Sequence, residues 1–206
     1  MIDWALLLLF APACFAINIA PGPNNLLAFA TSARAGAGVA LIGGAGRLAA
    51  FAAMIALAAA GLGILLLASE IGFAAVKLAG AAYLIWVGYK LWTAPVPREA
   101  HGAVRVRPVD QIRNEFLIAA GNPKAIATFI AFFPQFVDTA QPIAIQFLIL
   151  GIAFLLLEGL ALALYVVAGR VARRLLERPS RLRLLNRGTG AFLIGSGVTL
   201  ALSQRA

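Results

Sequence analysis

The chain has 206 residues, of which 62% are hydrophobic and 12% charged, and its mean hydropathy is +0.93. Soluble domains carry roughly 25% charged residues, so this composition excludes an ordinary soluble protein. It also excludes disordered, collagen-like and coiled-coil chains, which need high polarity or a repeat that this sequence lacks. The net charge of +9 comes from basic residues that lie between apolar runs, so it indicates membrane topology rather than nucleic-acid binding. We therefore expect an integral membrane protein.

Six apolar runs are candidates for membrane crossings, each of which needs about 20 residues. They fall at about residues 4–33, 39–68, 71–93, 115–137, 142–169 and 188–203. The first run is interrupted and the last is short. All six are rich in leucine and alanine and do not alternate, which argues against a membrane β-barrel. The predicted fold class is an all-α membrane protein with six transmembrane helices.

Basic residues predict the orientation of these helices. With six crossings, one side receives two basic loops, residues 94–113 and 170–187, whereas the other side receives Glu70 and Asp138. The positive-inside rule then places both loops in the cytoplasm and both termini outside.

The sequence resembles itself at an offset of about 100 residues, as expected of an internal repeat. Pro23 aligns with Pro123, and the segment 77–88 aligns with 187–197. The predicted organisation is a first three-helix repeat over 1–93, a cytoplasmic basic linker over 94–113 and a second three-helix repeat over 114–206. Because each half has three crossings, the second half enters the membrane from the opposite side, which makes the repeat inverted.

Helices one and four are predicted to be broken at corresponding positions of the two repeats. The first break contains Pro21, Gly22 and Pro23, and the second contains Asn122 and Pro123. Proline removes a backbone donor and frees the carbonyl one turn earlier, and such exposed backbone is tolerated at membrane depth only against protein or a watery cavity. Paired breaks of this kind predict a transporter's binding site near the membrane midplane. A plain kink that helps packing is the alternative.

Polar side chains within the predicted spans complete the candidate site. A charged side chain at the bilayer centre costs about 2.5–3.5 kcal/mol, so Arg47, Lys124 and Glu158 should face the bundle interior. We expect Glu158 to be the only acidic residue deep in a span, where it either carries a coupling proton or neutralises Arg47 or Lys124. The candidate substrate-binding residues are Asn18, Pro21, Gly22, Pro23, Asn24, Asn25, Arg47, Asn122, Pro123, Lys124 and Tyr165, with Glu158 as the proton-coupling candidate.

Three of these assignments have structural alternatives. Lys124 could extend to the cytoplasmic surface instead of the site. The asparagines suit a zwitterionic ligand but could equally form hydrogen bonds between helices. Tyr165 is either a site hydroxyl or an interfacial anchor.

Other functional classes fit the sequence less well. Ser196 lies between two glycines, as some serine nucleophiles do, but the sole histidine, His101, is in a predicted loop and leaves Ser196 without a base. Phosphate-binding and metal-binding motifs are absent from the sequence, so we expect no enzyme activity, no cofactor and no metal. A passive channel, or an exporter of another small metabolite, is the alternative function, because broken helices also line pores.

Several motifs occur in order along the chain. They are Pro21-Gly22-Pro23 in helix one, the run from Gly80 to Gly88 in helix three, Asn122-Pro123-Lys124 in helix four, Phe133-Pro134-Gln135-Phe136 after it, and a glycine-rich last helix. With these motifs the chain resembles the LysE/RhtB family of bacterial amino-acid exporters over essentially its whole length.

The resemblance implies export of amino acids or derivatives of the homoserine, threonine or lysine type, by proton antiport across the bacterial inner membrane. The expected partners are the amino-acid substrate, protons and membrane lipid, without nucleic acid and with a homo-oligomer as one option. The expected mechanism is alternating access, in which the two halves rock about a site formed by residues 21–25 and 122–124.

Overall fold

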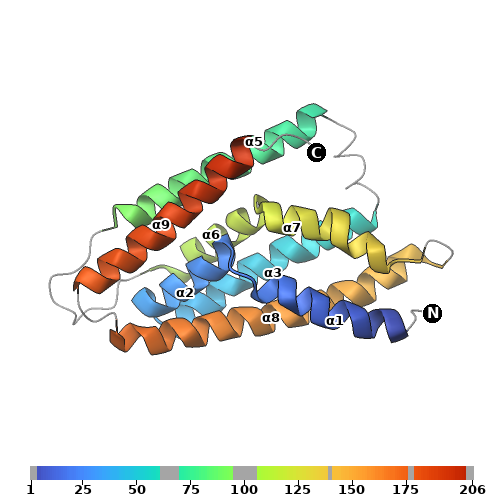
Figure 1. Cartoon of the computed structure of the whole chain (residues 1–206), viewed down its shortest axis with the longest axis horizontal. Coiled ribbons are helices and arrows are strands. Elements are labelled where there is room, and N and C mark those ends of the chain that lie inside the picture. Colours follow the sequence, from blue (N-terminus) through green and yellow to red (C-terminus); the bar gives the residue numbers. More distant parts are fainter. Residues whose placement is uncertain (1–3, 61–69, 95–105, 139–140, 176–178, 203–206) are drawn as a thin grey trace.

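The computed structural model describes residues 4–60, 70–94, 106–138, 141–175 and 179–202. These residues form eight α-helices and no strand (Figure 1). The helices are α1 (Trp4–Ile19), α2 (Pro23–Ala35), α3 (Ala37–Ala59), α5 (Glu70–Trp92), α6 (Pro108–Ala120), α7 (Pro123–Ala127), α8 (Ile143–Leu175) and α9 (Pro179–Leu202), and a π-helical turn (Thr128–Phe132) and a 3-10 turn (Phe133–Phe136) follow α7. The all-helical prediction is confirmed.

Two helices begin earlier than the apolar runs suggest. α6 begins at Pro108, so residues 108–113 of the predicted linker are helical, and α9 begins at Pro179 and has 24 residues, so it starts well before the short apolar run at 188–203. Both helices start with a proline, which suits the first helical position because its missing N–H would be unpaired there. Their first turns are polar, so each helix begins before its apolar run does.

Both predicted helix breaks are present. α1 ends at Ile19 and α2 begins at Pro23, with a bend of 58° between the two helices. α6 ends at Ala120 and α7 begins at Pro123. Each interruption therefore coincides with a proline that cannot donate a backbone hydrogen bond.

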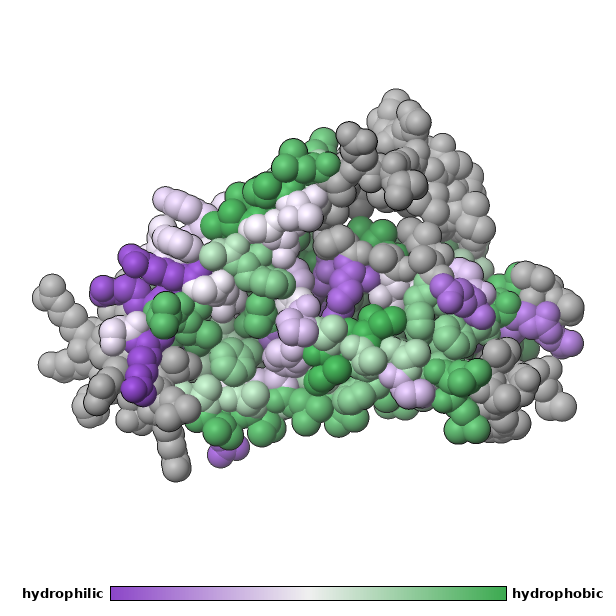
Figure 2. All heavy atoms as spheres, in the orientation of Figure 1, coloured by the Kyte–Doolittle hydropathy of each residue, from purple (hydrophilic) through white to green (hydrophobic). Residues whose placement is uncertain are grey.

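The described helices offer two or three candidate membrane spans. Ala37–Ala59 and Ile143–Ala172 are each long and apolar enough to cross, and the bent pair Leu7–Ile19 and Pro23–Ala35 counts as a third if it is one span. Exposed apolar side chains follow one face of α8 at helical spacing: Ile145, Leu148, Ile152, Leu156, Leu160, Leu164, Val167 and Val171. Figure 2 shows a nearly continuous hydrophobic surface along the lower edge, where α8 runs in Figure 1. Such a surface suits contact with lipid.

Close helix packing depends on glycines. A Cβ on Gly88 of α5 would lie 2.7 Å from the carbonyl oxygen of Gly190 in α9, and a Cβ on Gly190 would lie 2.6 Å from the carbonyl oxygen of Gly88. A Cβ on Gly197 would lie 2.7 Å from the carbonyl oxygen of Ala81. Residues later in α5 thus contact residues earlier in α9, so the two helices are antiparallel (Figure 1).

A cluster of phenylalanine rings fills the core on one side of the helix breaks. The buried members are Phe10, Phe51, Phe129, Phe133, Phe147 and Phe154. The rings of Phe129 and Phe154 lie 4.9 Å apart and those of Phe51 and Phe154 lie 5.6 Å apart, both close to edge-to-face. This aromatic cluster joins α1, α3, α8 and the turns after α7 into an apolar layer beside the breaks.

Candidate functional site

The end of α1 exposes carbonyl groups that the helix cannot satisfy by itself. In a continuous helix, the carbonyls of Ile17 and Ile19 would accept hydrogen bonds from residues 21 and 23. Both of those residues are prolines, which have no N–H to donate. The break therefore presents acceptors at the negative end of the α1 dipole.

Lys124 supplies donors to this end of α1 from the opposite half of the chain. Its ammonium group donates to the carbonyl oxygens of Ile17 at 2.8 Å and Ala20 at 2.9 Å. The side chain therefore reaches across to the first break, and the alternative in which Lys124 extends to the cytoplasmic surface is wrong. We call the Ile17 and Ala20 carbonyl oxygens the carbonyl cradle.

Two other side chains complete the capping of α1. The Asn25 amide donates to the carbonyl oxygens of Asn18 at 2.8 Å and Ala20 at 3.0 Å. The Tyr165 hydroxyl donates to the carbonyl oxygen of Ile19 at 2.9 Å. Each carbonyl from residue 17 to residue 20 thus has a side-chain donor, and the break is held by a built polar structure rather than left as a simple kink.

Asparagines join the two breaks directly. Asn122 caps α7, since its side-chain oxygen accepts from the backbone N–H of Lys124 at 3.0 Å. Its amide nitrogen donates to the side-chain oxygen of Asn24 at 3.1 Å, across a sequence distance of 98 residues. Asn18 donates to the carbonyl oxygen of Phe154 at 3.4 Å. Hydrogen bonds between helices, one of the two alternatives for these residues, are therefore present.

A fully buried ion cluster lies next to the breaks. Arg47 of α3 is 0% exposed, and its Nε lies 3.0 Å from Glu115 Oε2 while its Nη1 lies 3.1 Å from Glu158 Oε1. Arg47 also donates to the side chain of Asn25 at 2.9 Å and to the backbone carbonyl of Asn24. The guanidinium group therefore links α2, α3, α6 and α8.

Glu115 corrects the prediction that Glu158 is the only buried acidic residue of the spans. Glu115 is 0% exposed in α6, and its Oε2 accepts from the Asn24 amide at 2.8 Å as well as from Arg47. The prediction failed because Glu115 was placed at the start of a helix that in fact begins at Pro108. With the true start, Glu115 lies two turns inside the helix.

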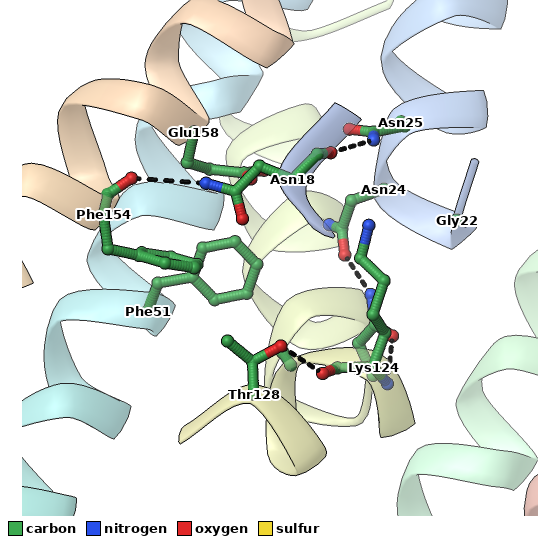
Figure 3. Close-up of a pocket in the computed structure, with 11 residues that line it drawn as sticks. Asn18, Gly22, Asn24, Asn25, Phe51, Lys124, Thr128, Phe154 and Glu158 are labelled. Atoms are coloured by element: carbon green, nitrogen blue, oxygen red, sulfur yellow. Dashed lines mark hydrogen bonds between the residues drawn. The ribbon is translucent and has the colours of Figure 1, made fainter. Parts of the chain in front are cut away.

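A small cavity lies between the two breaks (Figure 3). Its volume is about 10 Å³, which is room for about one water molecule. The residues that line it come from both halves of the chain: Asn18, Gly22, Asn24, Asn25, Phe51, Asn122, Lys124, Ala125, Thr128, Phe154 and Glu158. Asparagine, lysine and glutamate groups thus face the rings of Phe51 and Phe154 across it.

The predicted site residues divide into three groups. Those that line the cavity are Asn18, Gly22, Asn24, Asn25, Asn122, Lys124 and Glu158. Arg47 and Tyr165 contact the site from outside the cavity, through Glu158 and the end of α1. Pro21 is exposed and Pro23 is buried, and both shape the first break, while the side chain of Pro123 lies outside the described residues.

Sequence reasoning missed four lining residues, Phe51, Ala125, Thr128 and Phe154. The two phenylalanines belong to apolar runs in which nothing distinguishes a wall of a cavity from ordinary core. Thr128 lies one turn after Lys124 and donates to its carbonyl oxygen at 2.7 Å. Its helical spacing from Lys124 was the one available signal.

The formal charges of the site cancel. Arg47 and Lys124 are basic, Glu115 and Glu158 are acidic, and all four lie at or directly behind the cavity. In the part of the chain that the structure describes, no group of three or more His, Cys, Asp or Glu residues could hold a metal ion. The arrangement can hold a small polar molecule through amides, an ammonium group and a carboxylate.

Comparison with known proteins places the chain in a family. A family model described as LysE type translocator matches residues 15–204. The chain belongs to this family. The resemblance seen in the sequence motifs is thereby confirmed, and the protein is a transmembrane transporter of an amino-acid efflux family.

Relatives of this LysE-family chain include named efflux proteins. A homoserine/homoserine lactone efflux protein of Salmonella typhi is 29% identical over 191 residues, covering 92% of this chain and 93% of its own. A leucine efflux protein of Enterobacter sp. (strain 638) is 29% identical over 196 residues, covering 93% of each chain. An uncharacterized membrane protein of Pseudomonas aeruginosa is 35% identical over 195 residues, covering 90% of this chain and 89% of its own. No solved structure matches the chain.

Proposed function

We propose that this LysE-family protein exports small amino acids or close derivatives, of the homoserine and leucine type, from the cytoplasm through the cavity between its two helix breaks. The cavity supports this proposal because both halves of the chain contribute to it and because it contains both a cation and an anion, Lys124 and Glu158. Relatives named as homoserine and leucine efflux proteins support the substrate class.

The charge balance favours neutral amino acids over basic ones. The charges of the four ionisable groups of the site sum to zero, so a zwitterion leaves the total unchanged, whereas a lysine substrate would add an uncompensated positive charge at membrane depth. Within the homoserine, threonine and lysine range that the resemblance implies, we therefore propose the neutral members. The Phe51 and Phe154 rings offer an apolar wall for the substrate's side chain.

The small size of the cavity supports alternating access. A volume of about 10 Å³ cannot hold an amino acid, so the helices around it must separate when substrate binds. We propose that the two repeats, 1–93 and 114–206, move as units about the breaks, with the linker 94–113 between them. The Asn122 to Asn24 hydrogen bond is one contact that this movement would break.

The proposed inverted repeat is supported by reciprocal helix contacts. In the self-alignment, Gly88 corresponds to Gly197 and Gly80 to Gly190. The contact of Gly88 with Gly190 therefore has a counterpart in the contact of Gly197 with Ala81, next to Gly80. Such exchange of partners is expected of two halves related by a two-fold axis in the membrane plane. Six crossings in the bacterial inner membrane, with both termini outside, complete the proposed topology.

Glu158 is the proposed site of proton coupling. It lines the cavity while it also accepts a hydrogen bond from Arg47 at 3.1 Å, so it can exchange a proton with the cavity and still be paired when ionised. An antiporter needs such a group to be accessible from the substrate site. The pairing with Arg47 also supplies the structural role that was the alternative for Glu158.

The direct test is uptake of labelled homoserine and leucine into everted membrane vesicles that contain the protein. A gradient with an acidic lumen should drive saturable accumulation, because protons leaving the lumen would exchange for substrate entering it. Uptake that neither saturates nor responds to the gradient would indicate a passive channel instead. No uptake of any amino acid in a panel, with inserted protein of the correct orientation, would overturn the proposed substrate class.

The proton role of Glu158 has its own test. Glu158→Gln should abolish gradient-driven accumulation while leaving exchange of labelled for unlabelled substrate, which needs no net proton movement. Asp110→Asn, which removes an exposed carboxylate at the start of α6, serves as the matched control and should behave as the natural protein. Gradient-driven accumulation that survives in Glu158→Gln would exclude this residue as the proton carrier.

A further inference from the structure

The ammonium group of the half-buried Lys124 occupies an unusual position for a lysine. Within the described residues it forms no ion pair, and its two hydrogen bonds go to the carbonyl cradle of Ile17 and Ala20. Gly22 lies beside it, since a Cβ on Gly22 would lie 3.6 Å from the Lys124 nitrogen. A lysine of the second half is thus bound, through its ammonium group alone, at a helix end of the first half.

The carbonyl cradle is a site for a primary ammonium ion. Two carbonyl oxygens at 2.8 and 2.9 Å and the negative end of the α1 dipole provide what an R–NH₃⁺ group needs, and none of these groups can change its charge. An amino acid carries the same R–NH₃⁺ group on its α-carbon. Resting on the proposed function, we propose that the carbonyl cradle binds the substrate's α-ammonium group and that Lys124 is a tethered competitor that occupies it when no substrate is bound.

The carboxylate of the substrate explains how Lys124 is displaced. When the substrate's ammonium group enters the carbonyl cradle, the Lys124 ammonium exchanges two neutral carbonyl acceptors for the substrate's carboxylate, so its positive charge gains a partner of opposite charge. The exchange is between like groups at the same oxygens, so no carbonyl of α1 is left unpaired. Lys124 therefore selects ligands that carry an ammonium and a carboxylate together.

A ligand with an ammonium group alone is rejected by the same arrangement. It would have to displace Lys124 without offering it a partner, and it would add a positive charge to a site whose charges sum to zero. The protein should thus discriminate an amino acid from its decarboxylated amine. In the Lys124→Gln variant the carbonyl cradle holds no ammonium group and the site carries one net negative charge, so this discrimination should reverse.

The test compares binding of two ligand pairs to purified protein in detergent: leucine with isoamylamine, and homoserine with aminopropanol. The natural protein should bind each amino acid and be unaffected by each amine. Lys124→Gln should bind the amines at least about tenfold more tightly than the natural protein does, the change expected for a charged hydrogen bond, and should lose most of its affinity for the amino acids. Ligand-induced shifts in melting temperature and isothermal titration would measure this.

Two controls isolate the role of the charge and of its position. Lys124→Arg keeps a cation at the cradle and should continue to reject the amines. Lys90→Gln makes the same chemical change on an exposed lysine of α5, which stacks on Trp86, and should bind as the natural protein does. If Lys124→Gln does not fold, Lys124→Met replaces it, because methionine also removes the ammonium group.

The outcomes separate this inference from the proposed function. The competitor role would be overturned if folded Lys124→Gln bound the amines no more tightly than the natural protein does. It would also be overturned if the natural protein bound an amine as tightly as it binds the corresponding amino acid. Neither result requires transport, so either can be obtained even if the vesicles accumulate no amino acid. Conversely, gain of amine binding in a protein that transports no amino acid would leave the carbonyl cradle standing and overturn only the proposed substrate.

Discussion

At the scale of single residues, Arg47 is the centre of the buried ion cluster. It is fully buried, and its guanidinium pairs with both Glu115 and Glu158 while also capping backbone and amide oxygens of α2. A buried ion cluster is itself weak evidence for high stability, because desolvation offsets the attraction. Removing one member should destabilise the protein, since the remaining buried charges lose their partner.

We expect Arg47→Met to destabilise the protein by about 3–5 kcal/mol, the cost of leaving buried carboxylates unpaired. The melting temperature and the yield of monodisperse protein in detergent would measure the loss. A triple variant that also carries Glu115→Gln and Glu158→Gln should recover most of the stability, because it has no charge to pair.

Arg183→Gln provides the comparison, because it removes an arginine of α9 that is exposed. It should melt close to the natural protein. An Arg47→Met protein that is as stable as the Arg183→Gln protein would contradict the assignment of the buried cluster.

At the scale of helices, the first break depends on two prolines that each delete one donor. Because Ile17 and Ile19 lose their helical partners, their carbonyls become available to Lys124 and Tyr165. The polar end of α1 is therefore a consequence of the prolines, and the cavity that it borders depends on the break.

Restoring both donors should remove this site. In the double variant Pro21→Ala, Pro23→Ala, the chain can form continuous helical hydrogen bonds from residue 17 onward, so we expect membrane insertion but at least a tenfold loss of transport, the effect of losing about one charged hydrogen bond at the site. Pro12→Ala, which replaces an exposed proline inside α1, should transport normally. Equal rates in the two variants would mean that the first break is only a kink.

Packing of α5 on α9 requires the absence of side chains at the contact. Gly190→Ala would place a Cβ 2.6 Å from the carbonyl oxygen of Gly88, and backbone cannot move aside cheaply, so we expect a loss of about 1–3 kcal/mol. Gly195→Ala, in the same helix, meets nothing within 4 Å and should be neutral or slightly stabilising. Thermal unfolding of the two variants would show whether they differ in this direction.

At the scale of the whole molecule, the proposed topology requires the second broken helix to cross the membrane. Arg107 lies just before α6 and Gln141 just before α8, so a crossing places them on opposite sides and a re-entrant loop places them on the same side. Since Cys14 is 1% exposed, replacing it with alanine gives a background for single cysteines.

In that background, a membrane-impermeant maleimide should label Arg107→Cys only in everted membranes and Gln141→Cys only from the outside of cells. Labelling of both positions from one side would contradict the six-crossing topology. The positive-inside rule makes the further prediction that the Arg107 side is cytoplasmic.

The sequence predicted those features of the architecture that depend on a residue and its near neighbours along the chain. It did not predict features that depend on how distant segments meet. The breaks were predictable because a proline acts on the carbonyl four residues before it, and the inward placement of Arg47 and Lys124 was predictable from the cost of a charge in lipid. Glu115 was missed because polar residues at the start of α6 resemble a loop. The Lys124 contact with the carbonyl cradle depends on how two distant segments meet, which no local pattern encodes.

The claim that the cavity between the breaks is the substrate site can be measured directly at Thr128, which lines it. In vesicles that transport homoserine or leucine, the rate of maleimide labelling of Thr128→Cys, with Cys14→Ala, should fall as substrate is added, with half-protection near the concentration that half-saturates transport. Labelling of Arg107→Cys should not change. A Thr128→Cys labelling rate that is unaffected by a substrate that the same vesicles accumulate would show that transport uses another path.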